Sequence, residues 1–62
     1  MSHQITLRQA ERILIDNGYK KDRTRGGHIH YVNAEGNRIV VNTGLHHLVW
    51  RRIVKENQLQ IN

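Results

Sequence analysis

Apolar residues in the first part of the chain recur at helical spacing. Thr6 and Gln9 stand three residues apart at the start of this run, as in a capping box. The apolar stripe consists of Leu7, Ala10, Ile13 and Leu14. This spacing predicts a helix with one apolar face. Asn17 and Gly18 end it, because glycine suits the left-handed position that follows many helices.

A change to strand-like patterning predicts three strands in the middle of the chain. Tyr19–Arg25 is polar and basic, and Gly26-Gly27 after it is typical of a two-residue hairpin turn. The second expected strand is His28–Val32. Turn residues at 33–36 separate it from a third strand, expected at Asn37–Val41.

The second expected strand carries two histidines on the same side. Side chains alternate between the faces of a strand, so His28, His30 and Val32 share one face. Ile29 and Tyr31 share the other, which we expect to pack against helices.

The segment 42–44 breaks the third strand, and a second helix is expected from about His46 to Asn57. We expect its inner side to contain Leu45, Val49 and Ile53, with Leu48 and Trp50 as further candidates. Cations are expected on its outer side: Arg51, Arg52 and Lys55. Residues 58–62 are expected to form a short tail.

The order α-β-β-β-α predicts a single α+β domain over residues 1–62. Two amphipathic helices can both pack on one face of a three-stranded antiparallel sheet and leave the other face open. A basic protein could meet a partner on that open face.

Composition narrows the choice of partner. The 62 residues include ten Lys and Arg against five Asp and Glu, a formal net charge of +5. Charge of this sign suggests a polyanion, and nucleic acid is favoured over a membrane surface because the chain has no Phe and one Trp. With no Cys, no long apolar run and no signal-like start at residues 1–4, we expect a cytoplasmic protein without disulfides.

The hairpin around Gly26-Gly27 is the most informative segment for chemistry. RNA carries its own nucleophile, the 2′-hydroxyl, and histidine is suited to accept its proton near neutral pH. His28 and His30 are both candidates for this role, and the glycines would let an RNA backbone approach closely. Candidate phosphate contacts are Lys20, Lys21, Arg23, Arg25, Gly26 and Gly27.

Plainer interpretations remain open for the same residues. Histidines on an open strand face are often ordinary polar residues, Gly26-Gly27 can be no more than a turn, and a basic edge strand can serve to block aggregation. His28 and His30 could also bind a metal, but no carboxylate or cysteine lies near them in sequence. The adjacent rings of His46 and His47 are expected to point in different directions. We expect neither a metal nor a cofactor.

Nearly the whole chain, about Leu7 to Leu59, resembles the HicA toxins of bacterial toxin–antitoxin systems. The resemblance rests on the element order, the Asn17-Gly18-Tyr19 turn, Arg25-Gly26-Gly27-His28 before an alternating strand, and the last helix Trp50–Lys55. It implies a double-stranded-RNA-binding-domain-like fold, metal-independent cleavage of mRNA, and neutralisation by a HicB-like antitoxin. It places the catalytic histidine on His28. We expect His30 or a basic residue to assist. Family members commonly have two consecutive histidines, whereas Ile29 separates them here.

Two other functions are compatible with the same features. One is a non-catalytic module that binds double-stranded RNA by shape and phosphate contacts. The other is a protein-interaction domain whose positive face meets an acidic partner.

Overall fold

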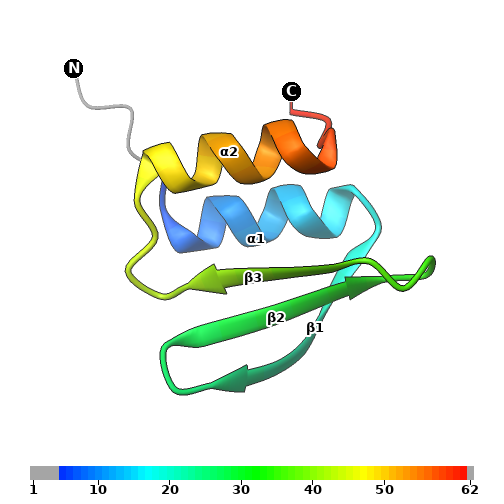
Figure 1. Cartoon of the computed structure of the whole chain (residues 1–62), viewed down its shortest axis with the longest axis horizontal. Helices are drawn as coiled ribbons and strands as arrows, with labels where there is room; N and C mark the ends of the chain where they lie inside the picture. Colours follow the sequence, from blue (N-terminus) through cyan, green and yellow to red (C-terminus); the bar gives the residue numbers. More distant parts are fainter. Residues whose placement is uncertain (1–4, 62) are drawn as a thin grey trace.

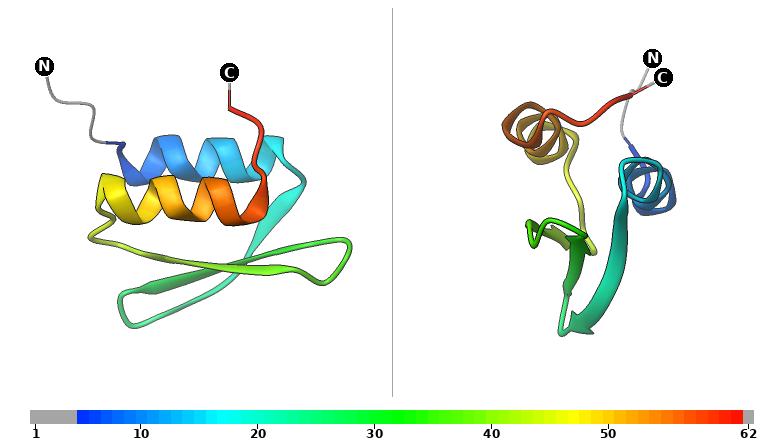
Figure 2. Two further views of the ribbon diagram at one scale, coloured as in Figure 1. Left: turned by 45° about the horizontal axis from the view of Figure 1, so that its top comes forward. Right: turned by 90° about the vertical axis from the view of Figure 1, so that its right-hand side faces the viewer.

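The computed structural model describes residues 5–61, which form two helices and one sheet (Figure 1). The elements are, in chain order, α1 (Leu7–Asp16), β1 (Tyr19–Arg25), β2 (His28–Asn33), β3 (Arg38–Asn42) and α2 (His47–Asn57). The strands are antiparallel in the order β1-β2-β3. Both helices cover the same face of the sheet (Figure 2), and the α+β arrangement expected from the sequence is confirmed. Neither helix has the length and apolar character needed to cross a membrane.

The caps of α1 have the geometry that the sequence predicts. The Thr6 hydroxyl accepts a hydrogen bond from the Gln9 amide at 3.1 Å, and the Gln9 side chain accepts one from the Thr6 amide at 2.9 Å. Both members of the capping box are therefore present. At the other end Gly18 has φ +90°, which brings the chain into β1.

The tip of the β1–β2 hairpin is tied to the segment after β3. Gly26 has φ +59°, in the left-handed region that favours glycine, whereas Gly27 lies outside that region. The Thr43 amide donates to the Gly27 carbonyl at 2.8 Å. This bond holds the tip beside the end of β3 and fixes where β2, with its two histidines, begins.

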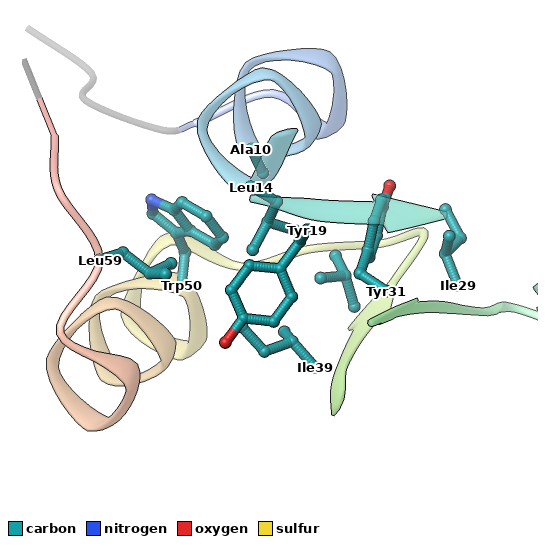
Figure 3. Packing of buried hydrophobic residues seen from close by; sticks show 9 residues of the cluster. Ala10, Leu14, Tyr19, Ile29, Tyr31, Ile39, Trp50 and Leu59 are labelled. Carbon is teal, nitrogen blue, oxygen red and sulfur yellow. The ribbon is translucent and has the colours of Figure 1, made fainter. Parts of the chain in front are cut away.

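The core lies between the helices and the covered face of the sheet (Figure 3). Ile29 and Tyr31 point into it from β2, so the predicted alternation along this strand is confirmed. Within residues 5–61, the buried residues are Ala10, Leu14, Tyr19, Ile29, Tyr31, Ile39, Val41, Trp50 and Leu59.

The expected inner side of α2 is confirmed for Leu45, Ile53 and Trp50 and wrong for Leu48 and Val49. Val49 and Leu48 are exposed, whereas Trp50 is buried and Ile53 and Val54 pack against the core. Trp50, Ile53 and Val54 have the i, i+3, i+4 spacing of one helical stripe. Because successive residues are about 100° apart on a helix, placing Trp50 inward turns Val49 toward solvent.

Residues 58–61 are not a simple tail. Gln58 takes a left-handed conformation at the end of α2, and Leu59 is buried after it. The Gln60 amide donates to the Asn17 side chain at 2.8 Å, and the Asn17 side-chain amide donates to the Gln60 carbonyl at 3.0 Å. The segment after α2 is therefore joined to the end of α1 and closes that side of the core.

Candidate functional site on the open face of the sheet

An irregularity in β1 decides which of its basic side chains lie beside the histidines. Lys21 lies opposite Tyr31, but Arg23 lies opposite His30, so Asp22 is an extra residue in β1. Such a bulge reverses the alternation beyond it. Arg23 consequently shares the open face with His30.

The open face consists of three cross-strand rows, one residue from each strand. Directly opposed residues place their side chains on the same face. The rows are Arg25–His28–Asn42, Arg23–His30–Val40 and Lys20–Val32–Arg38, and Asp22 adds its carboxylate from the bulge. Four cationic side chains and one carboxylate therefore surround two histidines.

The sequence-predicted phosphate contacts divide between the two faces. Lys20, Arg23 and Arg25 are exposed in the rows of the open face, and Gly26 and Gly27 are exposed at the hairpin tip next to His28. Lys21 belongs to the other side, opposite the buried Tyr31, and its Nζ lies 3.4 Å from Glu11 Oε2 of α1. All but Lys21 thus lie on the open face or at its hairpin tip, with Arg25 directly opposite His28 and Lys20 two rows away from it.

His28 is exposed at the start of β2, between Arg25 and Asn42. Its ring makes no hydrogen bond within residues 5–61. Both ring nitrogens are therefore open to a ligand, and a guanidinium lies on the neighbouring strand. This arrangement can accept a proton from a bound hydroxyl next to a phosphate held by arginine.

His30 has a different environment. Arg38 Nη1 lies 3.2 Å from His30 Nδ1 and 3.3 Å from Asp22 Oδ2. Asp22 also lies 4.0 Å from Arg23 Nε. The sequence analysis did not identify Arg38 or Asp22 as site residues. Alternation along β3 could have placed Arg38 beside the histidines only if the register of β2 with β3 had been known.

The other two described histidines lie at the start of α2. The rings of His46 and His47 are stacked, with centroids 4.6 Å apart and planes 27° from parallel, so the expectation that they point in different directions is wrong. His46 Nδ1 accepts from the Leu48 amide as the helix N-cap, which turns this ring over its neighbour. No three His, Asp or Glu side chains within residues 5–61 converge as a metal site would require. His3 lies outside the described residues.

The open face therefore combines an exposed histidine, a hydrogen-bonded histidine and a cationic surround. Comparisons with protein-family models, curated proteins and solved structures return no match for this chain.

Proposed function

We propose that the open face binds RNA and that His28 cleaves it. The binding part rests on the excess of cations over carboxylates in the three rows: Lys20, Arg23, Arg25 and Arg38 against Asp22. Contacts between such side chains and phosphates supply affinity that does not depend on base sequence. The net charge of +5 adds long-range attraction of the same sign.

The observation that carries the catalytic part is the position of His28. Its exposed ring, directly opposite Arg25, is open to substrate. In the proposed step His28 accepts the proton of a 2′-hydroxyl, and the 2′-oxygen forms a bond to the adjacent phosphorus. The bond from phosphorus to the 5′-oxygen breaks, and that oxygen takes a proton from water. Arg25 stabilises the negative charge on the reacting phosphate.

The biological setting we propose is that of a HicA-type mRNA interferase toxin. The resemblance of residues 7–59 to that family supports it, as does the position of His28 on the open face. mRNA is then the substrate, and a HicB-like antitoxin is the expected partner. Induction of the wild type in bacteria is expected to arrest growth and degrade mRNA, whereas His28→Ala at equal abundance is harmless. Equal toxicity of the two proteins would contradict the role of His28.

The binding surface can be tested with two adjacent lysines. Lys20→Gln removes a cation from the open face, and Lys21→Gln removes one from the helix side. RNA affinity should fall for Lys20→Gln, with a salt slope lower by about 1, and should stay at the wild-type value for Lys21→Gln. Equal losses would show that RNA does not bind on the open face.

A non-catalytic module for double-stranded RNA is the second candidate. The observation that favours it is the exposed cationic side of α2, formed by Arg51, Arg52 and Lys55. Duplex binding by shape would use a helix in this way. Purified wild type that binds duplex RNA tightly, leaves single-stranded RNA intact and loses affinity on Arg51→Gln would favour this function over cleavage.

A further inference from the structure

The two histidines of the open face differ in which of their ring nitrogens are available. His28 makes no side-chain hydrogen bond within residues 5–61, whereas His30 Nδ1 is 3.2 Å from a guanidinium nitrogen of Arg38. A guanidinium has N–H donors and no acceptor. His30 Nδ1 must therefore be the acceptor, and the ring proton must be on Nε2.

The second contact of Arg38 orients its guanidinium toward His30. The Nη1 atom that faces His30 also lies 3.3 Å from Asp22 Oδ2, and it carries two hydrogens, one for each partner. Asp22 reaches Arg38 because it is the extra residue of the β1 bulge. Both distances are at the long end for N–H hydrogen bonds, so the contacts select a ring state without immobilising the side chain.

The contact with Arg38 limits what the His30 ring can do with a proton. A His30 ring protonated on both nitrogens would direct Nδ1–H at a donor, so such a ring cannot make the hydrogen bond with Arg38. A neutral ring that gave up its remaining proton would become an anion, which excludes it as a general acid while Arg38 is in place. What remains is hydrogen-bond donation from Nε2–H, a use of neutral histidine that enzymes employ to stabilise developing negative charge.

We infer that His30 is an Nε2–H donor to a phosphate oxygen of bound RNA, that Arg38 and Asp22 are positioning residues for it, and that His28 alone exchanges protons. The inference rests on the proposed function, and it assigns different work to the two histidines. In the proposed reaction the Nε2–H group of His30 contacts a non-bridging oxygen and no bond to hydrogen is broken there.

The ring state can be measured without RNA. Long-range ¹H–¹⁵N NMR spectra of the full chain distinguish Nδ1–H from Nε2–H histidine, and His30 is expected to be a single Nε2–H tautomer. Arg38→Met should give His30 the mixture of tautomers usual for free histidine, and Arg38→Lys, which retains a donor, should restore the single tautomer. Arg25→Met is the matched control, since it removes a cation from the same face opposite His28 and should leave the His30 spectrum unchanged.

Amide substitutions test the work done by each ring. His30→Gln retains an N–H donor near the position of Nε2, so its kcat should stay within about tenfold of wild type, whereas His30→Ala should lose about 100-fold, as on removal of one oxyanion donor. His28→Gln should be as inactive as His28→Ala, because an amide cannot take up the proton.

Failure of the inference and failure of the proposed function give different results. A mixed or Nδ1–H tautomer at His30 in the wild type, or equal inactivity of His30→Gln and His28→Gln, would overturn the inference even where the wild type cleaves RNA. RNA left intact by a wild type with a single Nε2–H tautomer would overturn the proposed cleavage and leave the Asp22–Arg38–His30 arrangement standing.

Discussion

Replacing Tyr31 by Phe removes one hydroxyl from the covered side of the sheet and leaves the open face untouched. Tyr31 is fully buried, and its hydroxyl donates to Glu11 Oε2 at 2.8 Å. A hydrogen bond to a charged group contributes about 1.5–3 kcal/mol. Glu11 is 34% exposed, so water can solvate it in the variant, which lowers the expected loss to about 1–1.5 kcal/mol.

Thermal unfolding measures this loss directly. For a domain of this size 1 kcal/mol corresponds to about 4–8 °C, so Tm should fall by about 5–10 °C. Tyr19→Phe is the matched control. Tyr19 is also buried, but its hydroxyl makes no hydrogen bond within residues 5–61, so the same atom is removed at little cost. Equal Tm losses for the two variants would refute the reasoning.

The pH dependence gives a second check on the same bond. The hydrogen bond from Tyr31, followed by the contact with Lys21, holds the pKa of Glu11 below its usual value of 4.5 despite a partly opposing effect of burial. A lowered folded-state pKa contributes stability that is present above the unfolded value and is lost as pH falls through the folded one. The difference in stability between wild type and Tyr31→Phe should therefore shrink below about pH 4. A difference that stays constant from pH 7 to pH 3 would contradict this account.

The pKa of Tyr31 itself changes in the opposite direction. Burial and the Glu11 carboxylate raise the pKa of the Tyr31 phenol above its usual 10.0. The unfolded chain then loses this proton first, so wild-type stability should fall as pH rises above about 10. Tyr31→Phe lacks that contribution, and chemical denaturation at pH 9 and pH 11 measures it.

The remaining predictions concern the elements that support the site. Thr6→Ala removes the N-cap acceptor and should cost about 1 kcal/mol in a denaturant titration. Gly26→Ala should cost about 1 kcal/mol because Gly26 has φ +59°, whereas Gly27→Ala, whose Cβ would make an ordinary 3.5 Å contact with the Thr43 hydroxyl oxygen, should cost at most a few tenths. Trp50→Ala should cost at least about 3 kcal/mol and Val49→Ala less than about 0.5; equal effects would contradict the phase of α2.

The sequence was sufficient to predict the features that depend only on residues close together in the chain. The capping box at Thr6 and Gln9 satisfies donors within one helical turn. The Gly18 and Gly26 conformations follow from the need for positive φ at a helix end and a tight turn. The faces of β2 follow from alternation, because this strand has no bulge between His28 and Val32.

The parts that depend on pairing between distant residues could not be derived in this way. Strict alternation from the buried Tyr19 would place Arg23 and Arg25 on the covered side. The extra residue Asp22 moves Arg23 and Arg25 to the face of the histidines. No residue type in β1 predicts a bulge at this position. Arg38 reaches His30 only through the register of β2 with β3.

The side of α2 that faces the core could not be predicted with certainty from the spacing of its apolar residues. Leu48, Val49 and Trp50 are consecutive, so spacing alone allows more than one inner face. Burial of the largest side chain decides the choice, and Leu59 completes the core from beyond the helix end. For the site, alternation along β2 was enough to place His28 on the open face. The positions of the cations around it depend on how the three strands pair.

The most direct test of the central claim is cleavage of an RNA with a single 2′-deoxy nucleotide. The wild-type site is first mapped on an unmodified single-stranded RNA, and the deoxy sugar is then placed immediately 5′ of the broken bond. If His28 activates the 2′-hydroxyl, the unmodified strand yields a 2′,3′-cyclic phosphate and a 5′-hydroxyl, and the substituted strand is bound but stays intact at that position. Cleavage of the substituted strand at the same bond, or no cleavage of the unmodified strand, would contradict the account.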